Sequence, residues 1–340
     1  MKSSLRIEVP NGPTGDPLAV VRFRWIPRIV LFDAGEMSEV APRTLLNVSD
    51  VFISHAHLDH VFGLPRLLRL RLGQSEKPLR LYGPEGFCER VSHLLQSYSW
   101  NLGDHYPLHL DVVEIHADRC ERWEFPRRSG FDPYRAATSP GPYDAPVFED
   151  DLISVSARIL QHGTLASICY RLDESMSIHV NGARLAELGL EPGPWLGVLK
   201  TSIRSGETED TMIDLGGQKA PGGQSRLPLA QIRDLIIDIA EGESLAYATD
   251  FGPEEENLQT LIAFAAGCRR LLIECQYLAE DQALSRANAH LSTAEVGRIA
   301  RDVASAKIHP FHVSIRNYDR LDEVRAELEA ACHPIEVEWI

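Results

Sequence analysis

The chain has 340 residues, of which 44% are hydrophobic and 24% are charged, so it can bury a large core and does not have the composition of a disordered protein. Its formal net charge of -15 excludes a generally basic, nucleic-acid-coating surface, although a local basic patch can still contact phosphates. No apolar run is long enough to cross a membrane, and the first residues lack the apolar stretch of a signal peptide. We therefore expect a cytoplasmic protein that does not enter a membrane.

The six cysteines are scattered along the chain without any CxxC pair, which predicts reduced and mostly buried thiols rather than a disulfide framework or a cysteine zinc site. They are Cys88, Cys120, Cys169, Cys268, Cys275 and Cys332.

The first half of the chain alternates short apolar runs with turns and then with helical patterns. Helices are expected to begin at Leu64 and at Gly86. The expected strands are, in chain order, 18–26, 28–35, 51–54, 79–84, 108–115, 152–160 and 167–172.

Two stretches lack a clear period. Residues 124–149 are rich in proline and glycine and are expected to form a long surface loop. Residues of about 179–226 are also irregular, and we interpret them as an insertion that protrudes from a single domain spanning 1–340. Such long irregular segments are often functional.

Helical and strand patterns alternate in the last third of the chain. Helices are expected over 228–241, 256–267 and 292–306, and strands over 245–250, 270–275 and 308–314. Because strands and helices interleave in both halves, the order suggests sheets stacked as a sandwich and covered by helices.

The stretch HAHLDH gathers three imidazoles and one carboxylate within six positions, His55, His57, Asp59 and His60. Alternate residues of an extended segment point to the same side, so His55 and His57 are expected to face one point. Asp59 and His60 follow a turn and can serve a second point nearby. Two metal ions about 3.5–4 Å apart, which share and activate a water, are a familiar hydrolytic arrangement.

Further ligands must come from elsewhere, and three polar residues each follow a strand-like run: His162, Asp250 and His312. Strand ends at one sheet edge are where such folds tend to place chemistry. Taken singly, each of these residues is more often a core or capping side chain than a ligand. The HAHLDH cluster is different, because packed imidazoles would repel one another once protonated, and it predicts a metal.

The motif and seven other segments resemble, in order, those of the metallo-β-lactamase fold hydrolases and, among these, the ribonuclease Z family of tRNA 3′-processing endonucleases. The segments are LFDAGE at 31–36, FISHAHLDHVFGLPRLL at 52–68, YGPEGF at 82–87, ELGLEPGPWLGVLK at 187–200, AYATD at 246–250, LIEC at 272–275, AHLSTAEVGRIA at 289–300 and HVSIRNYD at 312–319. The resemblance spans nearly the whole chain.

This resemblance implies an α+β fold, a four-layer αββα sandwich, with two divalent metal ions. Zinc is the expected ion, with Mn²⁺ and Fe²⁺ as alternatives that a shell of His and Asp also accepts. The family pattern places His55, His57 and His162 on one ion, Asp59, His60 and His312 on the other, and Asp250 between them. Asp59 also matches the position that orients or deprotonates the attacking water.

Glu274 and His290 match the family pair that helps protonate the leaving oxygen. Independently of the family, Glu274 ends the apolar run RLLIE, where a buried carboxylate is costly unless it is paired, and a histidine satisfies both groups. From the residues alone, Glu274 and His290 can equally form a structural ion pair or a helix cap instead of a catalytic pair.

Three basic residues are candidates for substrate binding. In the family, a segment containing Gly-Pro lies on an arm that grips the tRNA elbow, so 179–226 is a candidate exosite in which Lys200 and Arg204 contact phosphates. Arg316 can contribute to a basic face near the metals. Glu207, Glu209 and Asp210 near the first two oppose that role.

The resulting hypothesis is a zinc-dependent hydrolase of the ribonuclease Z type, which removes the 3′ trailer of precursor tRNA through a metal-activated hydroxide. An alternative keeps the metals but acts on a small phosphodiester or ester metabolite. The acidic composition favours it, as does the N-terminal loop PNGPTGDPLAVVRFRW at 10–25, which lacks the Pro-x-Lys-x-Arg-Asn pattern of the family. A third hypothesis is a non-catalytic binding protein that retains the fold. The resemblance also implies a homodimer.

Overall fold

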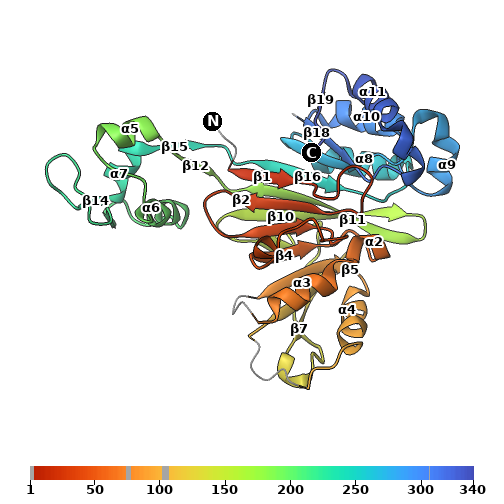
Figure 1. Ribbon diagram of the computed structural model, residues 1–340, viewed down its shortest axis with the longest axis horizontal. Coiled ribbons are helices and arrows are strands. Elements are labelled where there is room, and N and C mark those ends of the chain that lie inside the picture. The colour runs from red at the N-terminus through yellow and green to blue at the C-terminus, as the bar shows by residue number, and fades with distance from the viewer. Residues whose placement is uncertain (1–3, 74–77, 102–106, 306) are drawn as a thin grey trace. The chain divides into compact units, whose positions relative to one another are not determined.

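A computed structural model describes residues 4–73, 78–101, 107–305 and 307–340 (Figure 1). The chain divides into two compact units. The larger unit consists of Leu5–Phe148, Val155–Leu172 and Ser244–Ile340, and the smaller one contains Ser4, Glu149–Ser154 and Asp173–Glu243.

The first sheet of the larger unit has eight strands that follow one another in chain order. Strands β3 to β6 are parallel neighbours, and the outer pairs on both sides are antiparallel. The strands are β1 (Leu5–Glu8), β2 (Ala19–Phe23), β3 (Ile29–Phe32), β4 (Val48–Phe52), β5 (Leu79–Pro84), β6 (Leu110–Ile115), β7 (Arg119–Phe125) and β8 (Tyr134–Pro140). The parallel run places the carboxyl ends of β3 to β6 at one edge of the sheet.

The second sheet has seven strands in the order β19-β18-β17-β16-β11-β10-β9, with β16 to β19 parallel. Its strands are β9 (Phe148–Glu149), β10 (Ile153–His162), β11 (Leu165–Glu174), β16 (Ser244–Ala248), β17 (Arg270–Glu274), β18 (Lys307–Phe311) and β19 (Glu336–Val337). The apolar runs of β16 to β18 suit strands that are buried on both faces.

Helices lie beside both sheets of the larger unit, α3 and α4 near β5 and β7, and α8, α10 and α11 near β16 and β18 (Figure 1). Helix α10 begins with a capping box formed by Ser292 and Glu295. In the described part of the chain, no helix has both the length and the apolar character to span a membrane. The helices of this unit are α1 (Pro42–Leu45), α2 (Leu58–Val61), α3 (Leu64–Arg71), α4 (Phe87–Gln96), α8 (Glu255–Ala265), α9 (Gln282–Ala287), α10 (Thr293–Val303) and α11 (Leu321–Cys332), with short 3-10 turns at Arg127–Ser129, Ala279–Asp281 and Ile315–Arg320.

Aromatic side chains join the two sheets. Phe32 on β3 lies with its ring centroid 6.0 Å from that of Tyr170 on β11 and 5.4 Å from that of Tyr247 on β16. One apolar core packs α3 and α4 on the first sheet, and another packs α8, α10 and α11 on the second. The order helix, sheet, sheet, helix confirms the predicted α+β sandwich.

The smaller unit has a core of its own around Trp195, Leu199 and Ile232. The expectation of an irregular 179–226 segment was wrong, because α5 (Gly182–Glu187), α6 (Trp195–Arg204), β13 (Met212–Asp214) and β14 (Arg226–Pro228) lie there. Trp195 and Leu199 are four residues apart and so share one buried helix face, a pattern that the flanking glycines and prolines obscure. One domain with a protruding insertion stays a prediction.

Two other expectations were wrong. The loop expected over 124–149 contains strand β8, which pairs with β7. All residues of β8 are exposed, so the strand has no alternation of apolar and polar residues that the sequence could reveal. The helix expected over 228–241 ends earlier. Helix α7 (Leu229–Ile236) gives way to β15 (Ile237–Ala240), which pairs with β12 (Ser177–Val180), because β-branched isoleucines suit a strand.

Candidate metal centre

The HAHLDH motif lies where β4 leaves the first sheet. His57 is in an extended conformation and precedes α2, so His55 and His57 lie on the extended segment while Asp59 and His60 lie in the helix. Two backbone hydrogen bonds tie this turn to the loop after β3, from Ala34 N to His60 O at 2.8 Å and from Gly63 N to Ala34 O at 2.7 Å. A Cβ at Gly63 would lie 2.2 Å from a backbone oxygen, so only glycine permits this approach.

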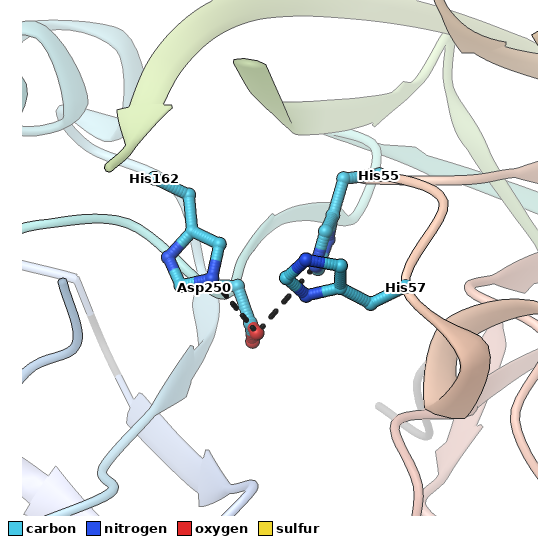
Figure 2. A group of neighbouring side chains, drawn as sticks. All are labelled: His55, His57, His162 and Asp250. Atoms are coloured by element: carbon cyan, nitrogen blue, oxygen red, sulfur yellow. Dashed lines mark ion pairs between the residues drawn. The ribbon is translucent and has the colours of Figure 1, made fainter. Parts of the chain in front are cut away.

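The first group brings His55, His57 and His162 around the carboxylate of Asp250 (Figure 2), with one ligand atom from each residue within 4.8 Å of the others. His55 Nε2 lies 3.6 Å and His162 Nε2 lies 3.9 Å from Asp250 Oδ2. All but His57 are buried. The fold therefore brings these four side chains, which come from three separate segments, to one point.

The second group consists of Asp59, His60 and His312. Asp59 Oδ2 lies 3.5 Å from His60 Nε2 and 3.4 Å from His312 Nε2. The same carboxylate of Asp250 also faces this group, with Oδ2 3.5 Å from His60 Nε2 and Oδ1 2.9 Å from His312 Nδ1. Asp250 thus lies between the two groups.

The pKa values of the histidines shift in two directions, depending on burial and on the neighbouring charges. Burial, together with His60, lowers the pKa of His55 to about 2, and burial with His162 lowers the pKa of His57, so both imidazoles are neutral and carry a lone pair. Burial also disfavours charge on His312, but Asp250 and Asp59 outweigh it and raise its pKa to about 10. A cation bound between these carboxylates competes with such a proton.

The donor atoms fit divalent metal ions. His55 Nε2 and His60 Nε2 are buried and have no hydrogen-bond partner in the described part of the chain, although both face Asp250. An orphaned buried nitrogen of this kind is costly unless something accepts its lone pair. Imidazole nitrogens and carboxylate oxygens are ligands of zinc and of other first-row divalent ions.

Asp33 is a member of the site to which the sequence analysis assigned no role. Its carboxylate accepts hydrogen bonds from Ser54 N at 2.7 Å and Tyr247 Oη at 2.8 Å, and it lies 2.8 Å from His60 Nδ1. A carboxylate on the far nitrogen fixes the tautomer and the orientation of a ligating histidine. Its position after a strand, in the segment LFDAGE, was the available signal.

The backbone around the centre is strained. Asp33, Asp250 and His312 have φ values of 53°, 51° and 55°, and Ala289, which precedes His290, has a φ of 55°. Non-glycine residues avoid this left-handed region, and such strain persists where the surrounding structure enforces it, often at functional sites. The carbonyl oxygen of Ala289 lies 2.9 Å from His162 Nδ1, within hydrogen-bond distance.

Glu274 and His290 form a pair next to the centre, where they share a group with Asp250. His290 Nδ1 lies 2.8 Å from Glu274 Oε2, and the other carboxylate oxygen accepts a hydrogen bond from Phe251 N. Burial disfavours charge on His290, but Glu274 outweighs it and raises the pKa of the imidazole. Glu274 is fully buried, so this pairing satisfies a group that would otherwise be costly.

The three basic candidates lie in different surroundings. Arg316 is exposed, four residues after His312. Lys200 is only 6% exposed, and Arg204 lies 3.9 Å from the buried carboxylate of Glu174. Substrate binding by all three stays a prediction, but burial within the smaller unit does not favour it for Lys200 and Arg204.

Residues 28–71 match the family model described as the metallo-beta-lactamase superfamily, over the stretch that carries HAHLDH. Two solved structures share the fold. The metallo-beta-lactamase fold protein YhfI from Bacillus subtilis superposes with a TM-score of 0.57 at 12% identity, over 98% of this chain and 96% of that one. Human tRNase Z, short form (ELAC1), gives 0.53 at 14% identity, over 92% of this chain and 93% of that one. The predicted metallo-β-lactamase superfamily and fold are confirmed.

Within this class, the chain is similar to proteins named ribonuclease Z. One from Deinococcus radiodurans is 29% identical over 298 residues, which cover 87% of this chain and 84% of that protein. The resemblance to ribonuclease Z is therefore confirmed, and the chain is a metal-dependent hydrolase that uses divalent metal ions.

Proposed function

We propose that this chain is a dinuclear phosphodiesterase of the ribonuclease Z type, which cleaves the 3′ trailer from precursor tRNA. The observation that carries the proposal is the convergence of two ligand groups and the Glu274–His290 pair on one carboxylate, that of Asp250. The ribonuclease Z relatives support the choice of tRNA as the substrate. The protein is proposed to act in the cytoplasm, which its six free, buried cysteines support.

We assign one ion to His55, His57 and His162, and a second to Asp59, His60 and His312, with Asp250 contributing to both. Zinc is the proposed ion, because neutral imidazoles and carboxylates are its usual ligands at hydrolytic sites. When bound, such ions supply positive charge to the scissile phosphate and lower the pKa of water.

Asp59 is proposed to orient the attacking water. Burial raises its pKa, but the hydrogen bond from His312 and the charges of His60 and His312 outweigh this and lower the pKa to about 2. The carboxylate is therefore ionised at neutral pH and is a weak base, which favours accepting a hydrogen bond from water over removing its proton.

His290 is proposed to donate a proton to the departing 3′ oxygen as the phosphorus–oxygen bond breaks. Its raised pKa, caused mainly by the charge of Glu274, favours the protonated form that such a step requires. Glu274 holds Nδ1 at 2.8 Å, which leaves Nε2 as the proton donor. General acid catalysis of this kind contributes about 10²–10⁴-fold. Glu274 acts through His290 and is a positioning residue.

A homodimer is also proposed. Two large apolar side chains next to the metal ligands are exposed, Leu58 at 72% and Phe62 at 53%. They are four residues apart across α2 and so lie on one face, and contiguous exposed apolar patches mark protein interfaces. The molecular mass in solution, measured by light scattering, tests this proposal, and a monomer at working concentrations would contradict it.

The substrate proposal is tested by incubating the zinc-loaded protein with a 3′-extended precursor tRNA, beside small linear and cyclic phosphodiesters. We expect a single cut at the trailer, and His290→Ala should slow it while leaving the metal content unchanged. Turnover of the small phosphodiesters alone would replace tRNA with a small-molecule substrate, a reading that the burial of Lys200 and Arg204 favours. A metal-loaded protein with no turnover of any kind would leave a binding role.

A further inference from the structure

A second group of buried potential ligands lies on the hairpin of β6 and β7, outside the candidate metal centre. Glu114 on β6 pairs directly with Glu121 on β7, and His116 follows the end of β6. Glu114 and His116 are two residues apart in extended backbone, so they share a face. One ligand atom from each of the three lies within 4.8 Å of the others.

Burial makes this arrangement costly. Glu114, His116 and Glu121 are 7%, 7% and 6% exposed. Like charges directly opposite each other on neighbouring strands destabilise a sheet, and buried carboxylates need partners. A cation between the two carboxylates would remove the repulsion between them.

Glu114 and Glu121 each accept hydrogen bonds from the described residues through one carboxylate oxygen, Oε1. Glu114 Oε1 accepts a hydrogen bond from Cys88 N at the start of α4, at 2.8 Å. Glu121 Oε1 accepts from Arg119 at 2.8 Å and from Arg135 at 3.1 Å. Within the described ranges, the Oε2 atoms of both glutamates make no hydrogen bond, so each carboxylate keeps an oxygen for a ligand.

His116 presents a donor nitrogen to the same point. Its side chain is 8% exposed, and Nε2 lies 3.4 Å from Glu114 Oε2. The orientation nevertheless gives no hydrogen bond, and Nε2 is among the buried atoms without a partner in the described residues. On the other side of the ring, Nδ1 lies 3.6 Å from the exposed carboxylate of Glu85. A carboxylate behind a histidine is the arrangement that orients metal ligands.

The surrounding charges also favour a cation. Four carboxylates and two guanidinium groups meet around His116, so these six groups carry an excess of two negative charges. They belong to Glu85, Glu114, Asp118 and Glu121, and to Arg119 and Arg135.

We propose that Glu114, His116 and Glu121 bind one divalent transition-metal ion, of which zinc is the representative. One imidazole with two carboxylates suits zinc or manganese, whereas Mg²⁺ and Ca²⁺ prefer oxygen ligands throughout. The ion would tie the β6–β7 hairpin to the start of α4. This inference does not rest on the proposed function, because it uses none of the ligands of the candidate metal centre.

Metal content tests the proposal. The wild type, His116→Ala and Glu114→Gln are loaded with Zn²⁺, dialysed and analysed by mass spectrometry of the metal. We expect each variant to hold one zinc ion fewer per chain than the wild type. Glu89→Gln, an exposed change on α4, is the matched control and should hold as many ions as the wild type. Equal zinc content in all four proteins overturns the proposal.

A second measurement guards against misfolding. Zinc should raise the melting temperature of the metal-free wild type more than that of Glu114→Gln, which keeps an acceptor for Cys88 N. Hydrolysis of bis(p-nitrophenyl) phosphate by the zinc-loaded variants should match the wild type, which separates this site from the candidate metal centre. An active wild type whose zinc content matches that of the variants overturns this inference and leaves the proposed function standing.

Discussion

Two clusters of buried ionisable side chains, one in each compact unit, differ in the charge they offer a ligand. In the candidate metal centre, carboxylates and neutral imidazoles surround Asp250, and the Nε2 atoms of His55 and His60 remain without hydrogen-bond partners among the described residues. In the smaller unit, the buried Lys200 and the side chain of Arg204, which is 11% exposed, both lie near the carboxylate of Glu174. The first cluster can accept a cation, whereas the second repels one.

Burial of charged side chains therefore does not by itself indicate a binding site. Donor atoms must also converge and remain available. Glu174 accepts hydrogen bonds from Ser4 Oγ and Glu243 N, so its charge holds parts of the smaller unit together. We therefore expect the first cluster to bind metal, and the second to affect only how the stability of the protein depends on pH.

The largest effect is expected from Asp250→Ala, because this carboxylate faces both ligand groups. We expect loss of bound metal and a fall in phosphodiesterase activity of about 10³-fold or more, since charge stabilisation at the phosphate is lost. Metal analysis and turnover are measured together. Asp302→Ala, on the surface of α10, is the control. Retention of a full metal complement would show that Asp250 is not shared.

The next largest effect is expected from His290→Ala, which should keep its metal and lose about 10²–10⁴-fold in turnover if His290 is the general acid. Turnover and metal content of the variant are measured together, and a loss of metal would contradict this role.

Glu274→Gln tests the cause of the raised pKa of His290. The negative charge of Glu274 raises the pKa of His290, so removing that charge should lower it. Because the acid must be protonated, the rate falls as the pH rises through this pKa, and the basic limb should move to lower pH in Glu274→Gln. An unmoved limb would assign it to another group.

Much of the centre was predictable because its key geometry is local. HAHLDH follows a buried strand, and the alternation of the extended segment brings His55 and His57 together without knowledge of the rest of the fold. His162, Asp250 and His312 were selected for their positions after strand-like runs, and the structure brings them to the same place. Their roles as ligands remain predictions until metal is measured.

The rest depends on contacts that no local pattern encodes. Asp33 reaches His60 through tertiary packing, and its strand end differs little in sequence from many others. Lys200 was expected to contact phosphates, yet it lies on the inner face of α6, beside Leu199. The residues of strand β8 are all exposed at the sheet edge, so no apolar periodicity could indicate the strand.

A smaller effect is expected from Asp33→Asn, which leaves the ligands intact but removes the charge behind His60. We expect metal affinity to fall by about 10–100-fold, the usual cost of losing a partner that orients a ligand. Asp50→Asn is a matched control, because Asp50 is also fully buried but pairs with Arg28 and Arg80. Zinc titration of both variants measures the difference. Equal affinities would mean that Asp33 is only structural.

The smallest effect on catalysis is expected from Lys200→Met, which should leave the rate of small phosphodiester hydrolysis unchanged. Its effect is on stability instead. Burial, together with Arg204, lowers the pKa of Lys200 from 10.5 to about 8, so between these values the unfolded chain binds more protons than the folded one. The stability of the wild type should therefore rise with pH across this window, and below it the cost of holding the charge is present in full.

Lys200→Met should abolish that rise and stabilise the protein near neutral pH by on the order of 1–2 kcal/mol. Urea unfolding at several pH values measures both changes, and Lys219→Met, an exposed lysine of the same unit, should change neither. A loss of tRNA cleavage in Lys200→Met with unchanged stability would reverse the comparison. It would mean that Lys200 contacts the tRNA substrate, because a side chain that only destabilises the folded protein changes its stability and not its turnover.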